Sequence, residues 1–260
     1  MNFVERQMLD MLKRGREEFG YVAIKAEFEA EGTRPDEFLR LLEITHRADL
    51  KVALKIGGCE AVSDLLSSKL YGVDYIIAPM VETHYALSKY IDAKNKTHNT
   101  DEQSQTDFLF NLETGTTLKN FSEMLPLAKS GVDGVVFGRV DFTLSRGMDR
   151  KAVNERSITD AVLEVARGCA EADIELVVGG SVSLDAVEAL KEIRAVRLDR
   201  FETRKVVFDG AAIESAAITA GIANAVDFEL AWLKNKRDYY AVIGSEDAKR
   251  IEMMEARAKG

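Results

Sequence analysis

Short apolar runs alternate with amphipathic helical patterns along most of this chain. The runs Tyr-Ile-Ile-Ala at 75–78 and Gly-Val-Val-Phe at 134–137 are apolar on both strand faces, as a parallel sheet covered on both sides requires. The pattern predicts seven strands, at residues 22–29, 52–56, 75–80, 107–113, 134–141, 175–179 and 195–201.

Helical patterns fill several of the intervals between these strands, at residues 35–46, 60–71, 118–130 and 157–172. Strand–helix alternation over 260 residues favours an α/β fold, either a (β/α)8 TIM-type barrel or a doubly wound sheet, in one domain spanning 1–260. An eighth strand is not evident, so it lies in the N-terminal region or the barrel is irregular. The polar segment 94–106 is predicted to be an exposed loop.

The C-terminal part, from about residue 210 to residue 260, reads differently. Residues 210–232 have the pattern of a mostly apolar helix, and residues 245–258 that of a charged amphipathic helix. We expect a helical C-terminal extension that packs on the barrel or on a neighbouring subunit.

Charge and composition exclude several classes of partner. The net charge of −9 gives no support for a nucleic-acid or anionic-membrane surface. No apolar run approaches the roughly 18–20 residues of a membrane span. Two cysteines, Cys59 and Cys169, do not make a disulfide framework and favour the reducing cytoplasm. The three histidines have no metal-ligand spacing, so a zinc site is not expected.

Acidic residues stand where two neighbouring predicted strands end. Glu113 closes the fourth strand and Asp141 the fifth, and a barrel takes its catalytic groups from the carboxyl ends of its strands. Because neighbouring strands lie about 4.8 Å apart, the two carboxylates can converge on one hard cation. Mg²⁺ uses one or two carboxylates together with water and substrate oxygens, and Mn²⁺ suits the same ligands.

Three motifs resemble those of the HpcH/HpaI aldolase and citrate-lyase family. Residues 131–147 read Gly-Val-Asp-Gly-Val-Val-Phe-Gly-Arg-Val-Asp-Phe-Thr-Leu-Ser-Arg-Gly, similar to a G-x-D-G…G-x-x-D-[LF]-x-x-S-x-G signature. Residues 110–114 with Asn120 are similar to an I-E-T…N motif, and residues 72–83 to a strand ending in P-M-V. The motifs occur in the family's order and at about its spacing, and together they cover roughly residues 51–147, with weaker similarity to about 208.

The resemblance implies a (β/α)8 barrel that forms a homo-oligomer and holds one Mg²⁺ or Mn²⁺. By the motif positions, Glu113 and Asp141 would be the metal ligands. The implied substrate is a 2-oxo acid such as pyruvate, and the implied reaction makes or breaks a carbon–carbon bond through an enolate, with an aldehyde as the second substrate of an aldolase. The chain around Gly138, Arg139 and Val140 would meet the substrate carboxylate, and Pro79 belongs to the matching P-M-V strand.

Two departures from the family pattern concern the catalytic groups. Lys55 stands where many members have an arginine, and a lysine is a point charge rather than a planar fork. The acidic–histidine pair of the aldolase branch is absent. On the first strand Lys25, Glu27, Glu29 and Glu31 share one face. Either this face lines the barrel mouth, with Glu27 or Glu29 as general base, or it is a solvated strand face.

Other interpretations stay open at this point. The enzyme could act on a CoA thioester like citrate lyase or malyl-CoA lyase, or form a Schiff base on Lys55. The chain could also be a non-catalytic barrel subunit that keeps the metal site. A dense charged set surrounds Phe201, either as a structural ion-pair network or as an anion-binding patch: Arg197, Asp199, Arg200, Glu202, Arg204 and Lys205.

Overall fold

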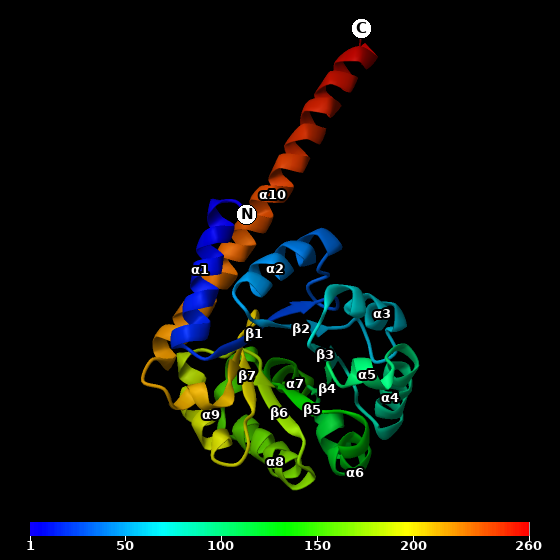
Figure 1. Cartoon of the computed structure of the whole chain (residues 1–260), viewed down its shortest axis with the longest axis vertical. Coiled ribbons are helices and arrows are strands. Elements are labelled where there is room, and N and C mark those ends of the chain that lie inside the picture. Colours follow the sequence, from blue (N-terminus) through cyan, green and yellow to red (C-terminus); the bar gives the residue numbers. More distant parts are fainter. Residues whose placement is uncertain (260) are drawn as a thin grey trace.

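Within residues 1–259, which the computed structural model describes, eight strands close into a barrel in their chain order (Figure 1). The strands are β1 (Tyr21–Glu27), β2 (Lys51–Lys55), β3 (Tyr75–Ala78), β4 (Asp107–Leu112), β5 (Gly134–Gly138), β6 (Glu175–Gly179), β7 (Arg200–Glu202) and β8 (Val206–Asp209). The barrel and its outer helices confirm the predicted α/β class of TIM type.

Helices cover the outside of this barrel. They are α1 (Phe3–Glu18), α2 (Pro35–Arg47), α3 (Val62–Tyr71), α4 (His84–Thr97), α5 (Thr100–Gln103), α6 (Gly115–Gly131), α7 (Arg139–Ser145), α8 (Arg156–Ala172), α9 (Val187–Arg194) and α10 (Ile218–Lys259), with short 3-10 turns at Arg150–Asn154, Leu184–Ala186 and Gly210–Glu214. The four predicted amphipathic helices correspond to α2, α3, α6 and α8, with ends displaced by at most three residues.

The barrel closes irregularly at its last strand. Neighbouring strands from β1 to β7 pair in parallel, but β8 runs antiparallel to both β7 and β1. The eighth strand is therefore not in the N-terminal region; it forms a hairpin with β7. The predicted strand 195–201 begins too early, because only its last two residues belong to β7. The strand β8 was not predicted from the sequence because β8 has just four residues and follows a charged turn.

Two other sequence predictions were wrong. Residues 94–106 are not an exposed loop, since they comprise the end of α4 and all of α5, and Lys94, Thr97 and His98 are buried. The C-terminal extension is one helix rather than two: α10 continues through Gly244 for 42 residues. Glycine lowers helix propensity by about 1 kcal/mol, which is too little to end a helix by itself.

Aspartates fix the register at the amino ends of the parallel strands. The carboxylate of Asp74 accepts a hydrogen bond from the Val52 amide at 2.8 Å. Asp133 accepts from Phe108, and Asp199 from Leu176, each at 2.7 Å. Each aspartate stands directly before its own strand, and its carboxylate is bonded to a backbone amide at the start of the preceding strand. The bond satisfies an amide that has no partner in the sheet ladder.

The two-residue alternation of side chains along the strands places the polar site above an apolar layer of the barrel interior. The barrel interior is filled by a cluster of small and apolar side chains: Ala23, Ala53, Tyr75, Ile77, Leu109, Val136, Val177 and Val207. Inward positions recur every two residues, so Ala23 is followed by Lys25, Ala53 by Lys55 and Leu109 by Asn111. The interior therefore changes from apolar to polar at the carboxyl ends of the strands.

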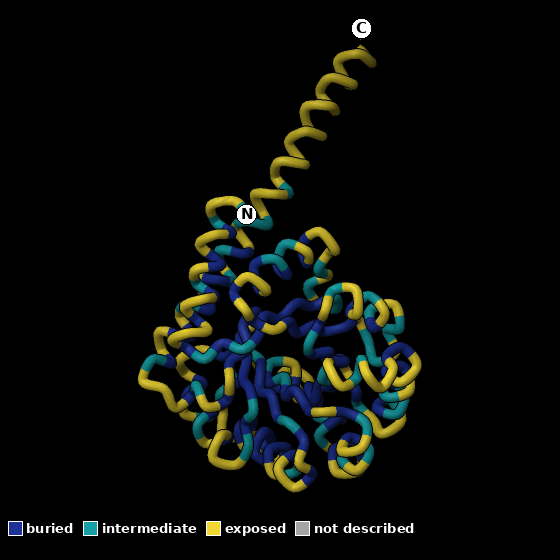
Figure 2. The backbone as a smooth tube through the Cα atoms, viewed as in Figure 1, coloured by how far each residue is buried: buried dark blue, intermediate teal, exposed yellow. Residues whose placement is uncertain are grey.

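The long helix α10 extends beyond the barrel. Its first turns pack beside α1, and its far half stands away from the body with its residues exposed (Figures 1 and 2). None of the helices in residues 1–259 has both the length and the apolar character that a membrane crossing requires.

Candidate active site

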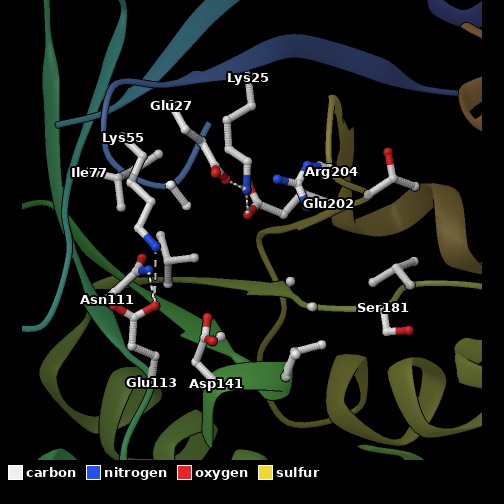
Figure 3. Close-up of a pocket in the computed structure, with 18 of the residues that line it drawn as sticks. Lys25, Glu27, Lys55, Ile77, Asn111, Glu113, Asp141, Ser181, Glu202 and Arg204 are labelled. Atoms are coloured by element: carbon white, nitrogen blue, oxygen red, sulfur yellow. Dashed lines mark hydrogen bonds and ion pairs between the residues drawn. The ribbon is translucent and has the colours of Figure 1, made fainter. Parts of the chain in front are cut away.

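A cavity of about 710 Å³ opens at the carboxyl ends of the strands. Charged side chains from strands, loops and helices line it, among them Lys25, Glu27, Glu29, Lys55, Glu113, Asp141, Arg150, Glu202, Arg204 and Glu229. Figure 3 shows Lys25, Glu27, Lys55, Glu113, Asp141, Glu202 and Arg204 around this cavity. The structure therefore places Glu27 and Glu29 at the barrel mouth and not on a solvated strand face.

Glu113 is the most constrained carboxylate of the cavity. It directly follows β4 and is only 2% exposed. Its Oε2 atom accepts a hydrogen bond from Asn111 Nδ2 at 2.6 Å and lies 3.3 Å from Lys55 Nζ. Its Oε1 atom accepts from the Met80 amide at 2.9 Å. Because donors from three strand ends hold it, the carboxylate is fixed in position.

Gly138 allows the neighbouring strand to approach this carboxylate. A Cβ atom at residue 138 would stand 3.0 Å from Glu113 Cβ and 3.3 Å from Glu113 Oε2. Any larger residue would therefore push against the Glu113 side chain. The glycine of the G-x-x-D segment therefore avoids a close contact with Glu113.

Asp141 reaches the cavity from a helix. The strand predicted at 134–141 ends at Gly138, and Asp141 lies in the first turn of α7. Its carboxylate lines the same cavity as Glu113 and forms no hydrogen bond or ion pair with any of residues 1–259 (Figure 3). Its surroundings raise the pKa of Asp141, first by removing water and second because the Glu113 carboxylate is near.

Lys55 is the cation that pairs with the carboxylates in this part of the cavity. It is buried at the end of β2, 3.1 Å from Glu29 Oε2 and 3.3 Å from Glu113 Oε2. Burial alone would lower the pKa of Lys55, but the charges of Glu113 and Glu29 outweigh it and raise the pKa. Lys55 is therefore held as an ammonium ion, which is the opposite of what a Schiff-base lysine needs.

The other side of the cavity is a network of ion pairs. Lys25 Nζ is hydrogen-bonded to Glu202 and lies 3.5 Å from Glu27 Oε1. Next to this group, Glu31 accepts from Arg204 Nε at 3.0 Å and is also paired with Lys205. The charged set near Phe201 is thus largely engaged in internal pairs.

Of the four predicted substrate-binding residues, two line the cavity and two do not. Gly138 and Val140 line it. Pro79 is buried behind Met80 and outside the lining. The Arg139 side chain turns away, and its guanidinium donates to the carbonyl oxygens of Gly179 and Gly180 and to Asn154. The side chains of Pro79 and Arg139 therefore lie outside the lining of this cavity.

Sequence reasoning missed several lining residues. Asn111 is buried and aligned with Glu113 by the two-residue strand period, a signal that could have found it. Met80 and Ser181 have left-handed backbones, with φ of +53° at both, which the sequence does not announce. Glu229 comes from α10, far along the chain, and only tertiary packing brings it to the cavity.

The residues on the acidic side fit a divalent cation. Glu29, Glu113 and Asp141 share the single positive charge of Lys55, so negative charge is in excess. The buried Oδ1 atom of Asn111 has no hydrogen-bond partner among the described residues. An unpartnered buried acceptor beside surplus carboxylates is an environment that a hard cation with its water would satisfy. No group of three or more histidine, cysteine or acidic side chains in residues 1–259 has metal-binding geometry, so protein would supply only part of the ligand shell.

Fold and site together define a β/α-barrel protein with an acidic pocket at the carboxyl ends of its strands. The chain belongs to the HpcH/HpaI aldolase/citrate lyase family, whose sequence profile matches residues 57–192, more than half of its length. This is a family of lyase type, and the match confirms the resemblance seen in the motifs.

Solved structures agree with this assignment at the level of the fold. An HpcH/HpaI aldolase from Desulfitobacterium hafniense DCB-2 has a TM-score of 0.57 at 13% identity, over 79% of this chain and 84% of that chain. An HpcH/HpaI aldolase/citrate lyase family protein from Burkholderia cenocepacia J2315 gives 0.58 at 14%, over 76% and 83%. A variant of the citrate synthase SbnG gives 0.55 at 13%, over 75% and 81%. A search of the curated proteins found no match.

Proposed function

We propose that the protein is a divalent-metal-dependent carbon–carbon lyase that acts on a 2-oxo acid such as pyruvate. The observation that carries the proposal is the unbalanced charge around Lys55, where three carboxylates meet one ammonium group. Family membership supports the lyase class. The words aldolase and citrate synthase in the names of similar structures describe reactions at carbon–carbon bonds.

Glu113 and Asp141 are the residues that would hold Mg²⁺ or Mn²⁺. When bound, the cation would polarise the oxo oxygen of the substrate and stabilise the negative charge that develops there. Asn111 and the Met80 amide orient the Glu113 carboxylate before any ligand arrives. Such preorganisation lowers the cost of fixing the ligand geometry during reaction.

Glu29 is the better of the two candidate bases. Cleavage next to a hydroxyl-bearing carbon requires a base that removes the hydroxyl proton. Glu27 is buried and paired with Lys25, whereas Glu29 is more exposed and, among the described residues, forms an ion pair only with Lys55. Lys55 would also offset charge on the substrate oxygen.

The backbone beside Gly138 is the proposed site for the 2-oxo acid's carboxylate. The Val140 amide lies in the first turn of α7 and has no acceptor among the described residues. A Cβ atom at residue 180 would stand only 2.7 Å from this nitrogen, so Gly180 leaves the space beside it free. Backbone amides in such a position are suitable donors for a carboxylate oxygen.

Isothermal titration with pyruvate tests this proposal. Wild type should bind pyruvate in the presence of Mn²⁺ and lose that binding in EDTA. The Glu113→Gln variant should bind both Mn²⁺ and pyruvate more weakly than wild type does. Turnover of a 4-hydroxy-2-oxo acid would then identify the second product. Pyruvate binding that is unchanged by EDTA and by Glu113→Gln would contradict the metal-dependent reaction, and so would its complete absence.

A second copy of this chain is the proposed protein partner. The far half of α10 exposes apolar side chains, including Val242, Ile251 and Met254. Between Asp238 and Lys259 it carries nearly as many basic as acidic residues, unlike the chain as a whole, so it repels another copy little. Light scattering should give an oligomer for wild type and a smaller species for Ile251→Glu with Met254→Glu. A monomeric wild type would contradict this.

A further inference from the structure

One buried arginine of this protein has no counter-ion among residues 1–259. Arg139 is 2% exposed, and its guanidinium donates to the carbonyl oxygens of Gly179, Gly180 and Ser181 at 3.4, 2.8 and 3.2 Å and to Asn154 Oδ1 at 3.1 Å. No carboxylate in residues 1–259 forms an ion pair with it. A buried cation held only by neutral acceptors is costly unless negative charge comes close to it.

The three carbonyl groups determine where the amides of the same turn point. In a trans peptide the C=O of one residue and the N–H of the next point in opposite directions. The N–H groups of Gly180, Ser181 and Val182 therefore point away from Arg139. None of them donates to an acceptor among the described residues, although all three residues line the cavity. The turn thus has three successive free donors.

The backbone of this turn has an unusual conformation. Gly180 has φ of +87° and Ser181 has φ of +53°, a region that a serine adopts at a cost in energy. Successive amides in turns of this kind form concave anion-binding nests. Figure 3 shows Ser181 on the side of the cavity away from Glu113 and Lys55. Ser181 is therefore distant from Glu113 and Lys55, whereas Gly180 lies beside the Val140 amide at the start of α7.

We propose that residues 179–182 form a second, anion-binding subsite of the cavity. The N–H groups of Gly180, Ser181 and Val182 bind a carboxylate or phosphate group, and Arg139 is the positioning residue that orients them from behind. In the reaction, this subsite takes the charged group of the substrate portion beyond the 2-oxo acid. That last assignment rests on the proposed function, whereas anion binding by the turn does not.

Amide resonances test the turn without metal or turnover. Wild type labelled with ¹⁵N-glycine and ¹⁵N-serine would be titrated with inorganic phosphate and, separately, with succinate. The Gly180 and Ser181 amides, assigned by their loss in Gly180→Ala and Ser181→Ala, should shift and saturate with at least one anion. The anion that shifts them identifies phosphate or carboxylate as the ligand class. If both amides stay in place with both anions, the subsite does not exist.

Replacement of the positioning arginine tests its link to the substrate. With Mn²⁺ present, wild type should bind oxaloacetate, which has a second carboxylate, more tightly than pyruvate. Arg139→Lys keeps the charge but cannot hold three carbonyls, so it should lose about tenfold in oxaloacetate affinity, as expected for a lost hydrogen bond to a charged group, with pyruvate affinity changed less than about threefold. Arg146→Lys, on the exposed end of the same helix, is the control.

The results separate this subsite from the proposed function. Equal losses for both ligands in Arg139→Lys, or no preference for oxaloacetate in wild type, would overturn the assignment to the substrate. If pyruvate does not bind with Mn²⁺ but the Gly180 and Ser181 amides still respond to an anion, the lyase proposal fails and the subsite stands. If Arg139→Lys does not fold, as circular dichroism would reveal, the wild-type amide titration still decides.

Discussion

The two sides of the cavity differ in how their charges are matched. On the side of β2, β4 and α7, the carboxylates of Glu29, Glu113 and Asp141 share one cation, Lys55. On the side of β1 and the β7–β8 hairpin, three cations meet three carboxylates. The members of this second group are Lys25, Glu27, Glu31, Glu202, Arg204 and Lys205.

This difference distinguishes the side of the cavity proposed for the reaction from the side where the barrel closes. The unbalanced side lies on the regular parallel strands and carries the family motifs, where surplus negative charge creates a demand for a cation. The balanced side lies where the barrel departs from the regular pattern, at the antiparallel strand β8. Ion pairs there satisfy buried charges at the closing hairpin, so we interpret this side as structural.

The sharpest way to break the comparison is to neutralise one carboxylate on each side. Glu113→Gln should reduce Mn²⁺-dependent pyruvate affinity more than about 100-fold, since even the loss of an outer partner of a metal ligand costs 10–100-fold. Glu202→Gln should lower the melting temperature and change that affinity less than about threefold. Titration calorimetry and thermal unfolding measure both effects. Equal losses of affinity would mean that the two sides form one functional unit.

Removal of the two lysines sharpens the same contrast. Lys25→Met leaves Glu27 and Glu202 buried without a partner, which should cost about 3–5 kcal/mol of unfolding free energy in urea denaturation. Lys55→Met removes the only cation that forms an ion pair with Glu113 among residues 1–259, so it should strengthen Mn²⁺ binding while slowing turnover. A Lys55→Met protein that binds Mn²⁺ more weakly than wild type would refute the idea of surplus negative charge.

The sequence predicted the parallel part of the barrel far better than its closure. Strands β1 to β6 can be recognised by their apolar runs. Glu113 and Asp141 were proposed as site residues from their positions in the motifs. The hairpin of β7 and β8 has only three and four residues per strand, too few for a period to emerge. The motif placed the backbone around Arg139 at the substrate carboxylate, but a motif does not show where a side chain points. The partners of the Arg139 side chain lie forty residues away in Gly179–Ser181.

The pH dependence of metal binding gives a smaller, graded test. The folded protein binds a proton at Asp141 more tightly than usual, so Mn²⁺ competes with that proton as the pH falls. Apparent Mn²⁺ affinity should therefore begin to decline at a higher pH than an ordinary aspartate would allow. For Asp141 alone, the sign for folding is the reverse: the metal-free protein loses stability as the pH rises through this raised pKa. Calorimetry on wild type and Asp141→Asn measures both, and identical pH profiles would contradict the assignment.

The smallest expected effect concerns the glycine that admits Glu113. Gly138→Ala places a methyl group 3.0 Å from Glu113 Cβ, so the carboxylate has to move by a few tenths of an ångström. We expect a severalfold loss of Mn²⁺ affinity with little change in melting temperature, because the shift displaces a ligand rather than opening the core. Gly58→Ala, in the loop that follows β2, meets no atom within 4 Å and should leave the affinity unchanged. If calorimetry gives Gly138→Ala the same Mn²⁺ affinity as Gly58→Ala, the close approach at Gly138 serves packing alone. Metal binding would then not depend on the exact position of the Glu113 carboxylate.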